Sequence, residues 1–160
     1  MRRIAIMIVL LITPAFALAQ QNAPPPPPAP KPGSPAIYKS AESLAAALKI
    51  AKATAGGMTT SAVANTDQYR INIVHRAQPA AAIAHEGNTE LHYIIEGSGT
   101  VVTGGKIVRG GDGKPATIAD GVTQRVKPGD VIIVPENSPH WYSQVDTAIT
   151  YLEVRWLAPK

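Results

Sequence analysis

The sequence predicts an all-β protein, an antiparallel sandwich or barrel preceded by a single helix. Apolar and polar side chains alternate with a period of two from Met58 almost to the end of the chain. Turn-forming residues interrupt this alternation at short intervals, and helical spacing is found over 40–53. Many short strands separated by frequent turns are typical of antiparallel all-β domains.

Residues 1–19 have the pattern of a secretory signal peptide. Arg2 and Arg3 precede an apolar run over 4–12, and a small-x-small sequence occupies 17–19. The run is short for a membrane span, which needs about 20 residues, although an uncleaved anchor is the alternative. We therefore expect a periplasmic or secreted product with no membrane span after signal cleavage. Because the chain has no cysteine, disulfides and a lipid-modified cysteine are excluded.

Residues 20–35 form a predicted proline-rich linker. The stretch PPPPPAPKPGSP has too few apolar side chains to build a core and favours extended polyproline geometry. A stiff spacer is the main interpretation, and a ligand for an SH3-type domain is the alternative. The remaining residues, 36–160, are enough for one folded domain with its own core.

The charge of the chain gives no indication of nucleic-acid binding. The formal net charge is +4, and Arg2 and Arg3 of the predicted signal peptide contribute two of these positive charges. The other charges are scattered, and the few aromatic residues are not interleaved with arginines. We therefore expect no nucleic-acid partner.

The helix is predicted over 40–53. Ser40 is a suitable N-cap, and Glu42 lies in the first turn, where a negative charge is favourable. One apolar stripe is formed by Leu44, Leu48 and Ala51, and the glycine pair at 56–57 is expected to end the helix. No residue here indicates chemistry, so the helix is expected to pack on the outside of the domain.

Nine strands are predicted after this helix. They cover 59–64, 69–76, 82–85, 90–96, 100–103, 123–126, 131–134, 140–145 and 149–156, with turns at 65–67, 97–99, 104–105, 128–130 and 135–139. The glycine-rich stretch 106–121 is expected to be an excursion between strands. It contains GDGK, but the G-x-x-x-x-G-K-[ST] pattern of a phosphate-binding loop is absent.

The last predicted strand has two contrasting faces. One face carries Tyr151, Glu153 and Arg155, and the other is more apolar, with Thr150, Leu152, Val154 and Trp156. We expect the apolar set to point inward or toward a dimer partner, and the sequence leaves these two alternatives open.

Four histidines, His75, His85, His92 and His140, fall on predicted strands or their edges, and Glu90 lies between two of them. Imidazole and carboxylate ligands together suit Fe, Mn, Zn, Ni or Cu rather than Ca or Mg. The sequence therefore predicts a divalent transition metal as the cofactor.

The segment HEGNTELHYIIEG, followed by PGD-x-x-x-x-P-x-x-x-x-H, resembles the two motifs of the cupin superfamily. The first motif, G-x5-H-x-H-x3,4-E-x6-G, is matched from its second histidine onward by His85, Glu90 and Gly97. The second motif, G-x5-P-x-G-x2-H-x3-N, is matched by Gly129, Pro135 and His140, with Asn137 and Gln144 replacing its second glycine and its asparagine. The resemblance covers about 70–156 and implies a small jelly-roll barrel with one metal in its mouth.

The chain departs from the family pattern at Ile83, which occupies the position of the first motif histidine. An ungapped hairpin with a loop over 86–89 would place His85 opposite Glu90 and Ile83 opposite His92. His92 would then replace the missing ligand from the neighbouring strand. The predicted metal ligands are therefore His85, Glu90, His92 and His140.

Four further residues are predicted to line the pocket. Tyr142 and Gln144 share a strand face with His140, and Ile83 lies in the metal motif. His75 shares a face with Ile71 and Ile73 and is the fourth pocket candidate. Trp141 is expected to point the other way, against an outer element.

Three functions are compatible with these residues. The first is a metal-dependent oxygenase-, isomerase- or decarboxylase-type enzyme acting on a small molecule, as the resemblance implies. The second is a non-catalytic module that binds or senses a metal or small ligand, and the third is a metal-free structural domain. The expected partner is a small-molecule ligand or substrate, and a homodimer is left open.

Overall fold

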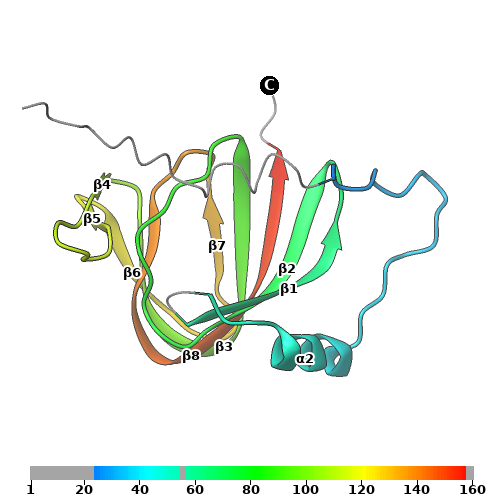
Figure 1. The fold of residues 1–160 in the computed structure, drawn as a ribbon, viewed down its shortest axis with the longest axis horizontal. Helices are drawn as coiled ribbons and strands as arrows, with labels where there is room; N and C mark the ends of the chain where they lie inside the picture. Colours follow the sequence, from blue (N-terminus) through cyan, green and yellow to red (C-terminus); the bar gives the residue numbers. More distant parts are fainter. Residues whose placement is uncertain (1–23, 55–56, 158–160) are drawn as a thin grey trace, which may run out of the picture.

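The alternating segment forms one curved antiparallel sheet in the computed structural model, which describes residues 24–54 and 57–157 (Figure 1). The predicted signal peptide lies outside the described residues, so it stays a prediction. Among the residues described, no helix is long and apolar enough to cross a membrane.

One helix, α2 (Ala41–Ile50), precedes eight strands. The strands are β1 (Met58–Asn65), β2 (Tyr69–Arg76), β3 (Asn88–Thr103), β4 (Lys106–Val108), β5 (Thr117–Ala119), β6 (Val122–Val126), β7 (Val131–Val134) and β8 (His140–Leu157). The main sheet has the order β1-β2-β8-β3-β6, and β7 also pairs with β3. The short hairpin β4-β5 lies in the predicted glycine-rich excursion.

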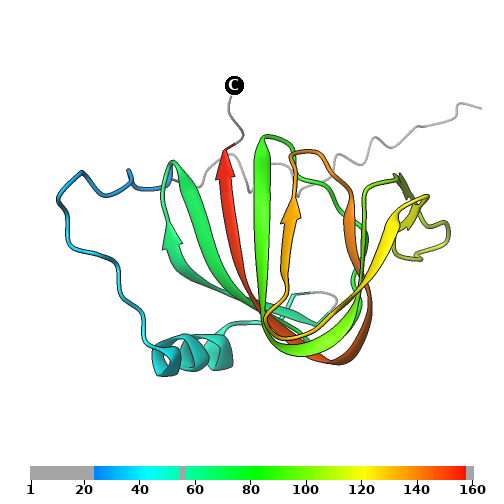
Figure 2. The same cartoon turned by 180° about the vertical axis from the view of Figure 1, so that it is seen from behind.

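The long strands β3 and β8 make the barrel because both bend sharply at its closed end, so each contributes to both walls (Figures 1 and 2). The predicted turn at 97–99 is this bend, where the pairing of β3 with β8 shifts register. Gly97 has φ +80°, and a Cβ there would lie 2.0 Å from the carbonyl oxygen of Ala148. The predicted pairs of strands 90–96 with 100–103, and 140–145 with 149–156, are therefore single bent strands.

Two other predicted elements are shorter than expected. The helix begins with Ser40 as its N-cap, as predicted, but ends at Ile50, before the glycine pair. The predicted strand over 82–85 is only an isolated bridge between Ile83 and His140. Helix α2 packs outside the sheet beside β1 and β2, as the sequence predicts.

The interior has an apolar layer and a polar layer. The apolar layer contains Val74, Ile94, Val101, Val126, Tyr142, Ile149 and Tyr151. Above it, Glu90, His92 and Glu153 are also buried. Because this polar layer takes the inward positions of β8, one of the two alternatives for Leu152 and Val154, that they point inward, is wrong. They lie on the outer face, so the other alternative, a contact with a dimer partner, stays a prediction.

Candidate metal centre

Strand β3 presents Glu90 and His92 to the barrel interior. The two residues are two positions apart on a regular stretch of strand, so their side chains leave the same face. Both are almost completely buried, with exposed fractions of 1% and 2%. Strand β8 lies alongside and pairs Glu153 with His92 and Arg155 with Glu90.

His85 and His140 reach Glu90 from the other wall of the mouth. Ile83 and His140 exchange two backbone hydrogen bonds of 3.1 and 2.8 Å. The carbonyl of His85 accepts a 3.0 Å bond from the backbone N–H of Asn137, which has φ 59°. These bonds hold the segment 83–85 beside the start of β8, so both imidazoles face β3.

The predicted hairpin register is therefore wrong. Ile83 pairs with His140, not with His92, and the strand that faces His92 is β8 on one side and β7 on the other. His92 nevertheless points inward, because it shares the inward face of β3 with Glu90. Alternation along β3 therefore predicts the inward orientation of His92 correctly, although its strand partners differ from the predicted one.

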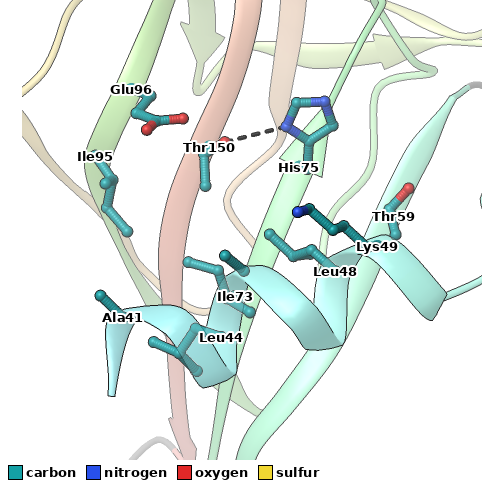
Figure 3. Close-up of a pocket in the computed structure, with 11 residues that line it drawn as sticks. Ala41, Leu44, Leu48, Lys49, Thr59, Ile73, His75, Ile95, Glu96 and Thr150 are labelled. Atoms are coloured by element: carbon teal, nitrogen blue, oxygen red, sulfur yellow. Dashed lines mark hydrogen bonds between the residues drawn. The ribbon is translucent and has the colours of Figure 1, made fainter. Parts of the chain in front are cut away.

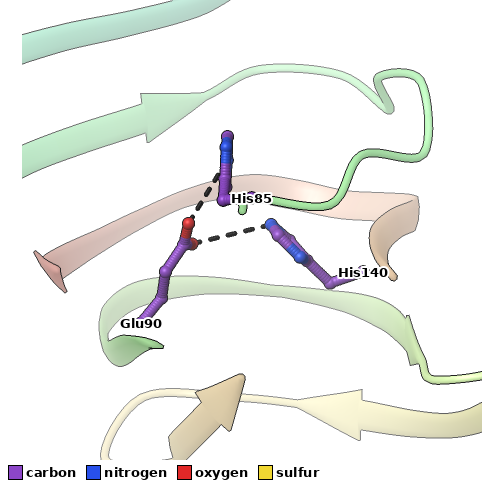
Figure 4. A group of neighbouring side chains, drawn as sticks. All are labelled: His85, Glu90 and His140. Carbon is purple, nitrogen blue, oxygen red and sulfur yellow. Dashed lines mark ion pairs between the residues drawn. The ribbon is translucent and has the colours of Figure 1, made fainter. Parts of the chain in front are cut away.

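The three inward histidines converge on the carboxylate of Glu90. Oε1 lies 3.2 Å from His85 Nε2, and Oε2 lies 3.1 Å from His92 Nε2 and 3.6 Å from His140 Nε2. Figure 4 shows His85 and His140 on either side of this carboxylate. Ligand atoms of His85, Glu90 and His140 all lie within 4.8 Å of one another, and those of Glu90, His92 and Glu153 form a second such group.

These residues fit a transition metal. Three imidazole nitrogens and a carboxylate are the donor types that such ions prefer. His85 Nε2 and Glu90 Oε1 are both buried without a hydrogen-bond partner, although they are only 3.2 Å apart. Two buried polar atoms that approach each other without a well-aligned hydrogen bond are costly unless a third group satisfies both.

A polar network missed by the sequence analysis supports the cluster from β8 and β2. Asn72 donates a 2.8 Å hydrogen bond to Glu153 Oε1, and Arg155 Nη2 donates one of 2.9 Å to Glu153 Oε2. Arg155 Nε also lies 3.2 Å from Glu90 Oε1. The signal in the sequence is the alternation of Tyr151, Glu153 and Arg155 on one face of the last strand, whose direction the sequence leaves open.

Burial and neighbouring charges set the protonation of the cluster. Burial lowers the pKa of His85 and of His140 below their usual value, although the negative charge of Glu90 opposes this. Burial tends to raise the pKa of Glu90, but the hydrogen bond from His92 and the charge of Arg155 outweigh it, so the net pKa is lowered. A neutral imidazole and an ionised carboxylate are the forms that bind metals.

The four predicted pocket residues do not lie together. Tyr142 is buried and its Oη lies 3.1 Å from His92 Nδ1. Ile83 pairs with His140 and so shares its face of the sheet, but the Ile83 side chain is 40% exposed. Gln144 is exposed and donates to Asp146, and a register shift in the pairing of β3 with β8 separates it from Tyr142. Trp141 donates to the carbonyl of Ala80, away from the interior.

His75 lies on the opposite face of the sheet from Glu90. Its Nδ1 is 3.1 Å from Thr150 Oγ1, in a cleft of about 550 Å³ between α2 and the sheet (Figure 3). Leu44, Leu48 and Ile73 line the same cleft. Among the described residues, the cleft and the histidine cluster share no lining residue, so His75 serves as a reference position outside the cluster.

A family model described as Cupin matches residues 46–151, which include every member of the histidine cluster. The chain belongs to the cupin family. The predicted jelly-roll barrel and the observed antiparallel strands agree with this assignment. No curated protein matches this chain.

Solved structures share the fold of this cupin at low identity. The Cnp3 cupin domain of Schizosaccharomyces pombe is 11% identical with a TM-score of 0.50, over 69% of this chain and 72% of that one. A structure of Fe(II)-HppE with the alternative substrate (S)-1-HPP is 13% identical with a TM-score of 0.50, over 62% and 49%. An RmlC-like cupin from Shewanella frigidimarina is 15% identical with a TM-score of 0.48, over 70% and 88%.

Proposed function

We propose that this cupin holds one divalent transition metal in the mouth of its barrel, with His85, Glu90 and His140 as ligands and His92 as a fourth. The observation that carries the proposal is the convergence of these side chains on one buried carboxylate. Two of the converging atoms, His85 Nε2 and Glu90 Oε1, are buried and unsatisfied. A shared ion would satisfy both.

The arrangement favours a centre that is open on one side. The His85 side chain is 29% exposed, whereas those of His92 and His140 are almost fully buried. A small molecule would therefore approach from the side of His85. A bound metal of this kind supplies Lewis-acid chemistry or a site for a coordinated small molecule.

The reaction class that we propose is of the oxygenase or isomerase type, acting on a small molecule in an exported compartment. Family membership supports a metal-binding barrel, but one barrel hosts many chemistries. The structural neighbour described as Fe(II)-HppE makes iron the first metal to test. No nucleophile with an adjacent base accompanies the cluster in the described residues, so the metal centre is the proposed reactive group.

One observation favours a second candidate, a non-catalytic module that binds a small ligand without metal. Arg155 already lies 3.2 Å from Glu90 and supplies a positive charge to that carboxylate. The cluster could then persist as a hydrogen-bonded network. Removal of metal would leave the fold and ligand affinity unchanged in this case.

Elemental analysis of protein purified without a histidine tag tests the proposal. We expect about one equivalent of metal in the wild type and loss of metal from the His140→Ala variant. His75→Ala is the matched control, since His75 lies on the other face of the sheet. The proposal would be contradicted if the wild-type protein took up no more Fe, Mn, Zn, Ni or Cu than a His85→Ala/His140→Ala double variant does.

Titration of His92→Ala separates a three-ligand centre from a four-ligand centre. Removing a group that only orients a ligand costs about 10- to 100-fold in affinity, so losing a ligand should cost at least that much. Competition with a chromogenic chelator measures the affinity. Unchanged affinity and stoichiometry in His92→Ala would remove His92 from the ligand set and leave the other three residues in place.

A further inference from the structure

Arg155 stands between the candidate metal centre and an open cleft. The pairing of β3 with β8 and of β8 with β2 places Glu90, Arg155 and Arg70 in one row across three strands. Arg155 is in the middle of this row, with Glu90 on its inner side. Its side chain is 20% exposed, whereas that of Glu90 is 1% exposed.

Only some of the hydrogen-bond donors of the Arg155 guanidinium have a partner in the protein. Its Nη2 donates one hydrogen bond, to Glu153. Its Nε lies near Glu90 but makes no aligned hydrogen bond. A guanidinium has five N–H donors in a planar fork that matches a carboxylate. Arg155 therefore has free donors at the edge of the metal centre.

Arg155 lines a polar cleft of about 200 Å³ beside the turn between β1 and β2. Its walls include Arg155, Arg70, Asn88 and Trp156. The acidic residue of the lining, Asp67, already accepts a hydrogen bond from the backbone N–H of Ala29. A volume of this size admits a small organic molecule, because one water occupies about 30 Å³ in the liquid.

A count of charges shows what such a molecule should carry. With a divalent cation bound, Glu90 and Glu153 would supply two negative charges against three positive charges from the cation and Arg155. This group of charges would then lack one negative charge, even before the buried Arg76 is counted, and an uncompensated buried charge is costly. Arg70 in the same cleft adds a further positive charge and has no ion pair among the described residues.

We propose that Arg155 binds the carboxylate of a small anionic ligand at the entrance to the metal centre. Arg155 is thus the residue that makes the site select anions over neutral molecules of the same shape. This inference rests on the proposed metal site and adds the chemical class of its ligand, a small carboxylate. The Arg155 guanidinium and the metal centre would share the negative charge of that ligand.

Cobalt(II) provides a readout that does not depend on turnover, because its visible absorption responds to ligands that enter the metal site. The cobalt-loaded protein is titrated with acetate, and with acetamide as a neutral molecule of the same shape. We expect acetate to change the spectrum with saturation and acetamide to have no effect. In Arg155→Gln, the acetate affinity should fall by at least about tenfold, because a charge-assisted pair is lost.

Two variants keep this test interpretable. Arg155→Lys retains the positive charge and should recover part of the acetate affinity, whereas Arg125→Gln, on the surface, should match the wild type. Equal acetate affinity in the wild type and in a folded Arg155→Gln protein that still binds cobalt overturns this inference and leaves the metal proposal intact. A wild type that takes up no cobalt overturns both, and the missing cobalt spectrum identifies that outcome.

Discussion

The imidazole of His92 is held at both of its nitrogens, with Nδ1 3.1 Å from the hydroxyl of Tyr142 and Nε2 3.1 Å from Glu90 Oε2. A neutral imidazole has one N–H donor and one acceptor nitrogen, so the two contacts are linked through the tautomer. Burial raises the pKa of Tyr142, which keeps its hydroxyl protonated and able to donate or accept. Tyr142 therefore helps to decide whether Nε2 presents a proton or a lone pair to the cluster.

We predict that Tyr142→Phe weakens metal binding. A metal ligand at Nε2 needs its proton on Nδ1, and the hydroxyl of Tyr142 is the group that accepts a hydrogen bond from that position. Loss of such an orienting partner should reduce affinity by about tenfold or more. Chelator competition measures this change.

Tyr93→Phe is the matched control for this substitution. Tyr93 follows His92 on β3 but points to the outer face and is 43% exposed. Its loss of a hydroxyl should leave metal affinity unchanged. If Tyr142→Phe binds metal as tightly as Tyr93→Phe does, then Nε2 of His92 is a hydrogen-bond donor to Glu90 rather than a ligand.

We predict that the metal-free protein loses stability as the pH falls below about 6.5. Burial lowers the pKa of His85 and His140 from the ordinary 6.5 in the folded protein. Below that value the unfolded chain takes up protons that the folded chain does not, so unfolding is favoured. Glu90 acts in the same direction below 4.5, because its pKa is also lowered in the folded protein.

Thermal unfolding followed by circular dichroism, on chelator-treated protein across this range, measures the effect. In Glu90→Gln, the part of the loss below 4.5 should shrink, because the carboxylate is absent. In a separate sample of metal-loaded protein, metal release should begin as the pH falls below 6.5, since the ligands must be deprotonated to bind. A melting temperature that stays constant or rises as the pH falls from 6.5 to 4.5 would contradict this prediction.

The fold could be predicted from the sequence because it depends on local patterns. Alternation located the strands, and two motifs in the right order identified the jelly-roll barrel. The bends in β3 and β8 could not be predicted. A glycine such as Gly97 is compatible both with a turn that ends a strand and with a bend inside one continuous strand. Its real role depends on Ala148, 51 positions further along the sequence, which leaves no room for a side chain.

The candidate site was predicted only in part, because local patterns place some of its residues whereas contacts distant in the sequence place the others. Glu90 and His92 share a strand, so alternation alone puts them on one face. Placing Ile83 required its strand partner, which is His140 and lies far along the chain. Arg155 and Glu153 were missed because the more apolar face of their strand was expected to point inward or toward a dimer partner, whereas the mouth of this barrel is filled with charged and hydrogen-bonded groups.

Arg76 gives a prediction that is independent of any metal. Its side chain is buried inside the barrel, and Nε and Nη1 have no hydrogen-bond partner. Its nearest groups are neutral: Nη2 donates to the hydroxyl of Tyr151 at 3.3 Å, and the guanidinium carbon lies 5.0 Å from the centre of the Tyr142 ring. Burial raises the pKa of both tyrosines, so neither supplies a negative charge.

We therefore predict that Arg76→Met leaves the protein equally stable or more stable, by up to about 2 kcal/mol. Burying a charge costs several kcal/mol, whereas a cation–π contact returns about 2 kcal/mol and a neutral hydrogen bond about 1 kcal/mol. Methionine fills much of the same space without a charge. Urea unfolding measures the difference, with Arg125→Met as the surface control expected to change little. A clear loss of stability in Arg76→Met alone would mean that a counter-charge, such as a bound anion, accompanies Arg76 in the barrel.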